Sequence, residues 1–371
     1  MTNTIIRRSP IVADFNNDSQ LDVVYLSATP NAVNVLLGNG NGTFRVGWTL
    51  ETGTSNILRR IVVGDFNSDD KPDLAFTDQY ANTMNVVFGN GNGTFGLLKT
   101  WSTGYGSYAE GIAAADFNGD SHLDIAVTNI YNNNIGLFFG NGNGSFSAQT
   151  TVSTGRNSNP KSISVSDFNL DGYIDIAVIN DGSRTIGISL GFGNGSFQLH
   201  QTYFTGGFYR PYFFAIGDFN SDSRPDIAFT YLADADGSEI YGNHNVSVFF
   251  GYANGTLSPK VTFPIANVTR YPVVSIGDLN GDGHLDIIAT VDNSYFTMAI
   301  FIGDGKGNFQ SQLVSTILDT DGIVVSKVAD FNGNGYQDIL AMGVTYGGMV
   351  ILLNKGRCYP NKTVETTTLI H

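Results

Sequence analysis

Short apolar segments alternate with Gly-, Asn- and Asp-rich segments along almost the whole chain. Residues 112–155 show one such unit, in which IAAAD, DIAVTN, NIGLFFG and FSAQTTVST follow one another. Short segments rich in Val, Ile, Phe and Thr and bounded by turn formers are typical of β-strands. No window shows sustained helical periodicity with caps at both ends, so we expect an all-β protein.

A nine-residue acidic string recurs seven times. The copies read DFNNDSQLD, DFNSDDKPD, DFNGDSHLD, DFNLDGYID, DFNSDSRPD, DLNGDGHLD and DFNGNGYQD, starting at Asp14, Asp65, Asp116, Asp167, Asp218, Asp278 and Asp330. Successive copies are 51, 51, 51, 51, 60 and 52 residues apart. The regular spacing identifies an internal structural repeat.

A second string, GNGNGTF or a close variant, keeps step with the first. It starts at Gly38, Gly89, Gly140, Gly191, Gly251 and Gly303, which lie 24, 24, 24, 24, 33 and 25 residues after the acidic string begins. The seventh copy has only Asn354-Lys355-Gly356 at this place. Asn-Gly supplies the positive φ angles of a tight hairpin, so this string predicts the turn between the third and fourth strands.

Four strands per repeat and seven repeats predict a seven-bladed β-propeller of four-stranded antiparallel blades. Length alone would favour two or three domains for 371 residues. Radial packing of blades instead predicts a single domain over residues 1–371. We expect the blades to start near residues 8, 59, 110, 161, 212, 272 and 324.

Closure of the ring depends on the two ends of the chain. Before Asp14 there is room for one strand, residues 8–13, and none left over from a preceding blade. We therefore expect the tail, residues 357–371 with the segment TVETTTLI, to supply the fourth strand of blade seven. The alternative is a last blade that lacks this strand.

The acidic strings have the composition of metal-binding loops. Positions one, three, five and nine carry Asp, Asn, Asp and Asp in copies one to six, and Ca²⁺ prefers six to eight oxygen ligands. Position seven varies, which favours a ligand role for its backbone carbonyl with the side chain pointing away. The predicted ligands are Asp14, Asn16, Asp18, Gln20, Asp22, Asp65, Asn67, Asp69, Lys71, Asp73, Asp116, Asn118, Asp120, His122, Asp124, Asp167, Asn169, Asp171, Tyr173, Asp175, Asp218, Asn220, Asp222, Arg224, Asp226, Asp278, Asn280, Asp282, His284, Asp286, Asp330, Asn332, Asn334, Tyr336 and Asp338.

Six to seven Ca²⁺ ions are therefore expected. Mg²⁺ is disfavoured because it keeps several waters and rarely occupies an all-protein cage. An Asx-rich turn without an ion remains the alternative, and it is strongest in copy seven, where Asn334 replaces the Asp of position five.

Charge and composition narrow the function classes. The chain has 19 Lys and Arg against 33 Asp and Glu, a net charge of −14, and 20 of those acids occupy the loop positions named above. This balance argues against a nucleic-acid partner. No apolar run approaches the roughly 18 residues of a membrane helix, and no apolar signal-peptide region precedes the first repeat. A single cysteine excludes a disulfide framework and a cysteine zinc site.

The pairing of D-F-N-x-D-x-x-x-D with a downstream F-G-x-G-x-G-x-F resembles the FG-GAP, or VCBS, repeat family over nearly the whole chain. This resemblance implies a seven-bladed propeller like that of integrin α-chains, with Ca²⁺ in the blade hairpins. The chain also looks like some secreted fungal propeller lectins that bind sugars between blades. In integrins only some blades hold ions, whereas at least six loops are competent here, which favours stand-alone FG-GAP repeat proteins.

In each blade the acidic loop and the glycine-rich turn are expected on one face of the propeller. The connections on the opposite face differ between copies and are candidates for ligand binding, because aromatic and Arg side chains on variable loops are common anchors of interfaces. The alternative is that they only cover loop backbone. These residues are Tyr80, Tyr105, Tyr108, Tyr131, Arg156, Phe208, Tyr209, Arg210, Tyr271, Tyr295 and Tyr346. Blade five has an insertion within residues 232–245, whose Asp234, Asp236 and Glu239 suit a solvated loop better than a further cation site.

Together these features predict a calcium-binding extracellular or cell-surface module for adhesion to a protein or a glycan. A structural repeat module without a ligand and a polysaccharide-active enzyme are the alternatives. Catalysis has little support, because the five His have no recurrent partner. Glu is scarce, so a paired-carboxylate glycosidase would need the Asp residues already assigned to calcium. We expect no enzyme, and the sequence leaves the oligomeric state open.

Overall fold

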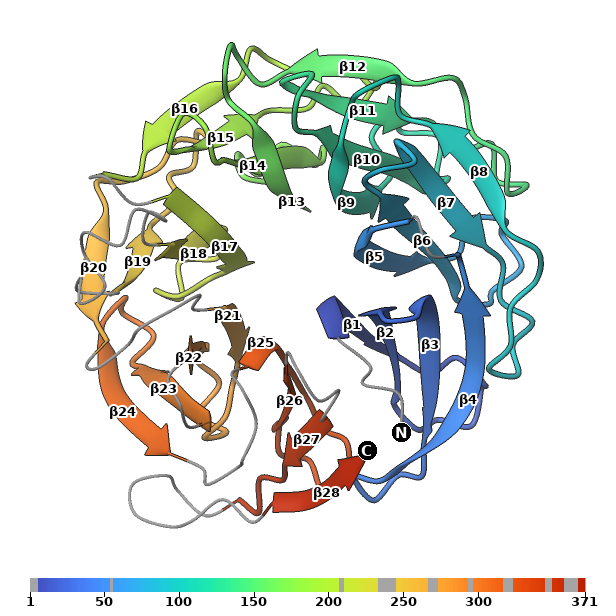
Figure 1. The fold of residues 1–371 in the computed structure, drawn as a ribbon. Helices are drawn as coiled ribbons and strands as arrows, with labels where there is room; N and C mark the ends of the chain where they lie inside the picture. The colour runs from blue at the N-terminus through green and yellow to red at the C-terminus, as the bar shows by residue number, and fades with distance from the viewer. Residues whose placement is uncertain are drawn as a thin grey trace.

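The computed structural model of the protein is a ring of seven four-stranded antiparallel sheets around a central axis (Figure 1). It describes residues 6–53, 56–206, 210–232, 245–265, 273–292, 296–315, 323–343, 349–356 and 366–370. Every helix or strand assigned within these ranges is a β-strand. The predicted all-β, seven-bladed propeller is confirmed.

The strands follow one another from the axis to the rim in each blade. Blade one contains β1 (Ile6–Ala13), β2 (Asp22–Ala28), β3 (Asn31–Gly38) and β4 (Phe44–Glu51). Blade two contains β5 (Leu58–Gly64), β6 (Asp73–Asp78), β7 (Thr83–Val87) and β8 (Lys99–Ser102). Blade three contains β9 (Ala109–Ala115), β10 (Asp124–Asn129), β11 (Asn134–Phe138) and β12 (Thr150–Ser153). Blade four contains β13 (Pro160–Ser166), β14 (Asp175–Asn180), β15 (Thr185–Ser189) and β16 (Gln201–Phe204).

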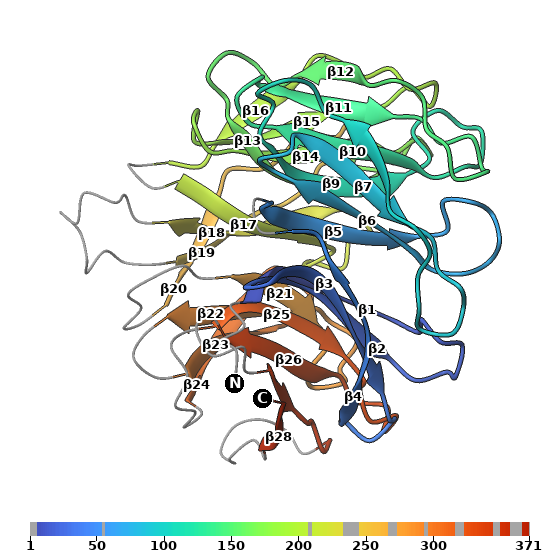
Figure 2. The ribbon, with the colours of Figure 1, turned by 45° about the vertical axis from the view of Figure 1, so that its right-hand side comes forward.

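The remaining blades repeat this order. Blade five contains β17 (Arg210–Gly217), β18 (Asp226–Leu232), β19 (Asn245–Phe249) and β20 (Val261–Pro264). Blade six contains β21 (Val274–Gly277), β22 (Asp286–Asp292), β23 (Phe296–Gly303) and β24 (Phe309–Ser315). Blade seven contains β25 (Ile323–Ala329), β26 (Asp338–Gly343), β27 (Met349–Leu352) and β28 (Thr366–Ile370). The strands run across the ring between its two faces, so each blade contributes connections to both (Figure 2).

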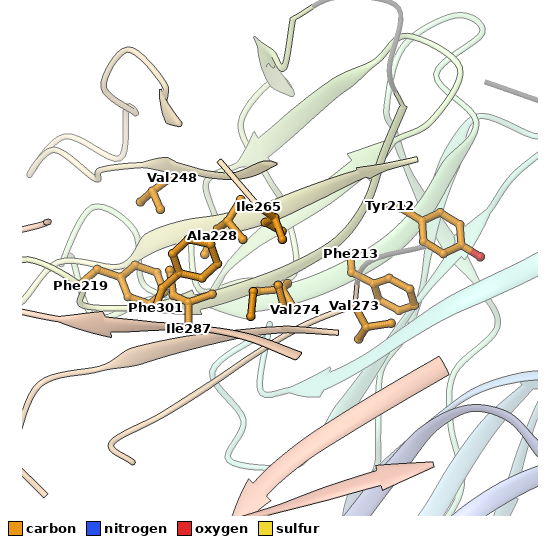
Figure 3. Close-up of a cluster of buried hydrophobic side chains, with 13 residues drawn as sticks. Tyr212, Phe213, Phe219, Ala228, Val248, Ile265, Val273, Val274, Ile287 and Phe301 are labelled. Carbon is orange, nitrogen blue, oxygen red and sulfur yellow. The ribbon is translucent and has the colours of Figure 1, made fainter. Parts of the chain in front are cut away.

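The core is a set of apolar layers between neighbouring blades. All six residues of β6, β10 and β14 are buried, because both faces of an inner strand pack on adjacent blades. Figure 3 shows the layer between blades five and six, where Phe219, Ala228 and Val248 meet Ile287 and Phe301. No helix in the described part of the chain has the length and apolarity of a membrane span.

The ring closes through blade seven. The tail strand β28 pairs with β27 in an antiparallel register, so the last sheet has four strands. Between blades seven and one, Val23 and Leu36 share a buried cluster with Leu340 and Ile351. Hydrophobic packing between the first and last repeats therefore completes the ring.

His200 is a partly buried base that makes stability depend on pH. Its Nε2 accepts a hydrogen bond from Asn180 (3.1 Å) and its Nδ1 faces Ser189 Oγ (2.8 Å), a pattern that fits the neutral ring. Burial lowers the pKa of His200 from 6.5 to about 4. Between these pH values the unfolded chain binds a proton at His200 that the folded chain does not, so the contribution of His200 to stability falls as pH decreases through this window.

We therefore expect acidification from neutral pH toward pH 4 to destabilise the wild-type protein more steeply than a His200→Gln variant. The difference in slope should approach about 1.4 kcal/mol per pH unit at its steepest. Urea unfolding at a series of pH values measures both slopes. Parallel stability curves for the two proteins would contradict this role of His200.

Candidate metal centres and the opposite face

Each acidic string forms the loop between the first and second strands of its blade, and its backbone N–H groups point at its own carboxylates. In blade two, Asp65 accepts hydrogen bonds from the N–H groups of Asn67 (3.3 Å), Asp69 (3.1 Å) and Asp70 (2.7 Å). Asp69 in turn accepts one from the N–H of Lys71 (3.1 Å). Positions one and five are thus drawn to the inside of the same tight loop.

A second feature of the loops is left-handed backbone at positions four and six. In all seven copies φ is positive at Asn17, Ser19, Ser68, Asp70, Gly119, Ser121, Leu170, Gly172, Ser221, Ser223, Gly281, Gly283, Gly333 and Gly335. Only Gly adopts this conformation without a steric penalty, and Leu170, with φ of 59°, departs furthest from that preference. Strained backbone that recurs at one position points to a function for the loop.

The Asp at position nine joins the acidic loop to the hairpin turn. It is fully buried in every copy. One carboxylate oxygen accepts the N–H of position two at 2.7–3.0 Å. The other accepts the N–H of the first residue of the turn at 2.6–2.9 Å. This bond explains why the two sequence motifs keep step, and in blade seven Asn354 takes the place of the Gly.

The position-nine carboxylates carry an electrostatic penalty. Burial, together with the nearby carboxylates of Asp69 and Asp65, raises the pKa of Asp73 to about 6, although the N–H groups of Gly89 and Phe66 lower it in part. The same causes raise the pKa of Asp124, Asp175, Asp226 and Asp286 to about 6. Three carboxylates therefore interact within one loop, and a cation among them would offset the repulsion.

The donor set of the loops suits calcium, although the structure does not preassemble it. Within the described ranges, no three His, Cys, Asp or Glu side chains stand in a ready-made metal-binding arrangement. Each of copies one to six nevertheless offers three carboxylates, an Asn side chain and a backbone carbonyl, which are the hard oxygen ligands that Ca²⁺ prefers. In copy seven, the side-chain amide of Asn334 donates to the carbonyl of Asn354 (2.7 Å), so this loop is the least suited.

The side chain at position seven lies outside the loop, against the second glycine of the hairpin turn. Gln20, His122 and Tyr173 lie in this way against Gly40, Gly142 and Gly193. Tyr173 is 48% exposed there. In copies two and five the position-seven cation instead pairs with the position-five carboxylate, Lys71 with Asp69 (3.2 Å) and Arg224 with Asp222 (3.4 Å). The backbone carbonyl of position seven is the group that all copies can offer to a metal.

The first glycine of the turn is required by close contact with the acidic loop. A Cβ on Gly89 would lie 2.2 Å from the carbonyl oxygen of Pro72, and five other copies show the same clash at 2.2–2.3 Å. We expect Gly89→Ala to destabilise the protein by about 2 kcal/mol or more, because backbone must move to admit the methyl group.

The matched control is Gly96→Ala, since a Cβ there would meet only Phe88 O at 3.6 Å. We expect this variant to stay within about 0.5 kcal/mol of wild type. Denaturant unfolding measures both, and equal stabilities of the two variants would contradict the close contact at Gly89.

Each acidic loop is also packed against the hairpin turn of the next blade. The buried Phe at position two faces the turn Phe of the following blade, as in Phe15 with Phe95 (ring centroids 5.9 Å). The N–H of Gly93 in the same turn donates to the carbonyl of Phe15 (2.9 Å). Across the closure, Phe331 of blade seven meets Phe44 of blade one at 6.0 Å. The loops are therefore supported from two blades at once.

On the opposite face, three of the predicted aromatic residues lie together. Tyr108 stacks on Tyr131 with ring centroids 4.6 Å apart and approaches Tyr80 at 5.7 Å. Tyr105 and Arg156 are exposed on the same face, and Arg210 pairs with Asp181. The other candidates lie outside the described residues, namely Phe208, Tyr209, Tyr271, Tyr295, Tyr346, and the insertion residues Asp234, Asp236 and Glu239.

Sequence reasoning missed a cavity beside these tyrosines, at the ends of the innermost strands. Its volume is about 300 Å³. It is lined by residues of blades two to five, namely Arg59, Gln79, Tyr108, Glu110, Ile130, Tyr131, Asn159, Lys161, Asp181 and Tyr212. The repeat could have indicated this cavity. One position of successive 51-residue copies differs in chemistry from blade to blade, being Arg59, Glu110, Lys161 and Tyr212.

Comparison with known proteins places this propeller in a family. The chain belongs to the FG-GAP-like repeat family, which matches residues 14–76, 65–127, 118–178, 167–229, 234–289 and 278–341. The resemblance drawn from the acidic and glycine-rich strings is thus confirmed, and it is consistent with a propeller of the integrin α type. Among curated proteins, no sequence relative is found.

Similar solved structures include a lectin, a lyase and a protein complex. An Agrocybe aegerita lectin that recognises non-reducing terminal N-acetylglucosamine is 19% identical, with 86% of this chain and 81% of that chain covered and a TM-score of 0.56. Virginiamycin B lyase from Staphylococcus aureus is 14% identical (94% of each chain, TM-score 0.60). BBS1N, in its complex with ARL6DN, is 11% identical (94% and 93%, TM-score 0.63). At these identities the similarity concerns the fold.

Proposed function

We propose that this FG-GAP propeller is a calcium-binding extracellular adhesion module. Its acidic loops hold six to seven Ca²⁺ ions, and the face of the variable loops binds a protein or a glycan. The observation that carries the proposal is the division between the two faces. One face repeats the same acidic loop in every blade, whereas the other gathers stacked tyrosines and a polar cavity from residues that differ between blades.

The loops support the calcium part of the proposal through their charge. Asp65, Asn67, Asp69 and Asp73 supply side-chain oxygens in blade two, and the carbonyl of Lys71 adds a backbone ligand. The raised pKa of Asp73 indicates that the metal-free loop resists carrying all three charges. When bound, Ca²⁺ would supply the missing positive charge and hold the strained loop.

The expected affinity supports an extracellular location. Calcium sites of extracellular modules have dissociation constants of about 10⁻⁴–10⁻³ M. The free calcium concentration outside cells is high enough to fill such sites, whereas the free calcium concentration in the cytosol is too low. The proposed role is binding without a catalytic step.

The opposite face supports the binding part. Tyr131 is 62% exposed and Tyr80 is 55% exposed, although both contact the ring of Tyr108, Tyr131 by stacking and Tyr80 at a tilt. Exposed aromatic clusters on variable loops are typical of binding surfaces. Propellers of similar fold include a lectin and a protein that forms a complex, so both ligand classes are compatible with this architecture.

A glycan array and a protein pull-down, each in millimolar calcium and in EGTA, test the proposal. We expect a ligand on one of the two platforms in calcium and its loss in EGTA, because the blade loops then lose their ions. A protein that is folded and calcium-loaded but captures no ligand on either platform would contradict the binding role. Binding without any bound calcium would contradict the metal role.

A further inference from the structure

The cavity beside the stacked tyrosines is built from equivalent positions of successive blades. Arg59, Glu110, Lys161 and Tyr212 begin the innermost strands of blades two to five and are spaced by 51 residues. Gln79, Ile130 and Asp181 follow the second strands at the same spacing. In Figure 1 the innermost strands β5, β9, β13 and β17 surround this part of the central opening. The cavity, which we call the axial pocket, therefore lies at the mouth of the ring on the variable face.

Tyr212, which lines the axial pocket, is next to a contact between two blades. Tyr212 packs edge-on against Phe213 with ring centroids 4.8 Å apart. The guanidinium of Arg60 from blade two lies over the Phe213 ring of blade five at 4.8 Å, so two non-adjacent blades meet across the axis. In Figure 3, the ring of Tyr212 lies at some distance from Phe219 and Phe301, and its hydroxyl points away from these two rings.

The walls carry both charges in a connected network. Arg59 donates two hydrogen bonds to Oε1 of Gln79, one of them at 2.8 Å from Nε, and Gln79 Nε2 donates to Glu110 Oε2 at 3.1 Å. The opposite wall has Asp181, whose Oδ2 receives both Lys161 Nζ (3.1 Å) and Arg210 (3.2 Å). These pairs balance most of the charge, which disfavours a ligand of high net charge of either sign.

The second carboxylate oxygen of Asp181, Oδ1, is not the one that Lys161 and Arg210 contact. The Asp181 side chain is 4% exposed, and within the described part of the chain Oδ1 has no hydrogen-bond partner. A buried acceptor without a donor costs free energy, so a ligand group that donates a hydrogen bond to this oxygen would be stabilised there. Lys161 stands beside this acceptor with an ammonium that has three donors. A hydroxyl can donate to Asp181 and accept from Lys161, so neighbouring hydroxyl groups match this pair.

The rim adds an apolar surface. Tyr108 and Tyr131 both line the pocket and stack on one another at 4.6 Å, which presents an aromatic face next to the polar walls. A ligand that matches both surfaces has an apolar ring face and hydroxyls along its edge. We propose that the axial pocket binds the uncharged end of a glycan, with its sugar ring against Tyr131 and its hydroxyls at Asp181 and Lys161.

This inference rests on the proposed function and specifies its ligand. An array of neutral and anionic glycans, probed with the full chain in millimolar calcium, identifies the glycan to use. Calorimetry with the methyl glycoside of its terminal sugar then compares wild type with three variants. We expect Tyr131→Ala and Asp181→Asn to weaken binding by about tenfold or more. The control Tyr252→Ala, at an exposed tyrosine in the hairpin turn of blade five that does not line the pocket, should bind as wild type does.

The outcomes separate this inference from the proposed function. Thermal unfolding verifies that each variant is folded, and the exposed Tyr131 makes its variant informative even if Asp181→Asn is unstable. Glycan binding that survives both pocket variants would overturn the axial site but leave a glycan-binding module. Preference for anionic glycans, or capture of a protein in place of a glycan, would overturn the ligand assignment and also leave the binding function. If the protein binds no glycan on the array and captures no protein in the pull-down, both the axial glycan site and the proposed binding function are overturned.

Discussion

Removal of calcium should lower the midpoint of thermal unfolding by roughly 10 °C or more. A ligand that binds only the folded state stabilises it by RT ln(1 + [L]/Kd), which is about 0.4 to 1.4 kcal/mol per site when free calcium is about 1 to 10 times Kd. Because six loops with three carboxylates each are affected at once, removal of calcium is expected to change the free energy of unfolding more than any other change of solution conditions. Calorimetric scans in millimolar calcium, in millimolar magnesium and in EGTA measure it, and magnesium should restore little of the loss.

A pair of loop variants separates metal binding from simple charge. Asp69→Asn changes a proposed ligand, whereas Asp70→Asn makes the same charge change one residue later at the left-handed position six, which Asn tolerates. The calcium-dependent shift should shrink in Asp69→Asn and stay unchanged in Asp70→Asn. An equal effect of the two variants, or no effect of calcium on wild type, would contradict loops that bind the ion.

The second large effect is expected at the closure of the ring. Phe331→Ala should destabilise the protein by about 3–5 kcal/mol, because truncating a buried Phe leaves a cavity between blades seven and one. Phe331 is 4% exposed and packs edge-on against Phe44, and its carbonyl accepts the N–H of Gly42 (3.1 Å). Urea unfolding measures the loss.

The control is Phe192→Ala, the same truncation at a side chain that is 55% exposed in a hairpin turn. It should change stability by less than about 1 kcal/mol. Similar losses in the two variants, or a stable Phe331→Ala protein, would show that the contact between the first and last blades does not hold the ring together.

The fold was predictable because its information is local and repeated. Almost every copy carries its own strands, its acidic loop and its glycine-rich turn, so seven copies at intervals of 51 to 60 residues specify seven similar units. The structure places the first strands of successive blades at Ile6, Leu58, Ala109, Pro160, Arg210, Val274 and Ile323, near the positions that the spacing predicts. A pattern within one repeat needs no knowledge of distant contacts.

The parts that were missed depend on contacts between distant residues. The spacing of the two motifs was visible, but only the structure shows that Asp73 joins them by accepting the N–H groups of Phe66 and Gly89. The axial pocket combines four blades, and residues such as Gln79 and Asp181 have no meaning in a single copy. Exposed tyrosines were detectable as divergent loop residues, whereas polar residues at the start of a strand look like ordinary strand positions.

The central claim is that the acidic loops bind calcium. Equilibrium dialysis of the intact chain against radioactive calcium at millimolar free concentration counts the bound ions directly. We predict six to seven equivalents per chain, displaced by EGTA and retained in excess magnesium. Well under one equivalent, with the protein folded, would contradict the claim.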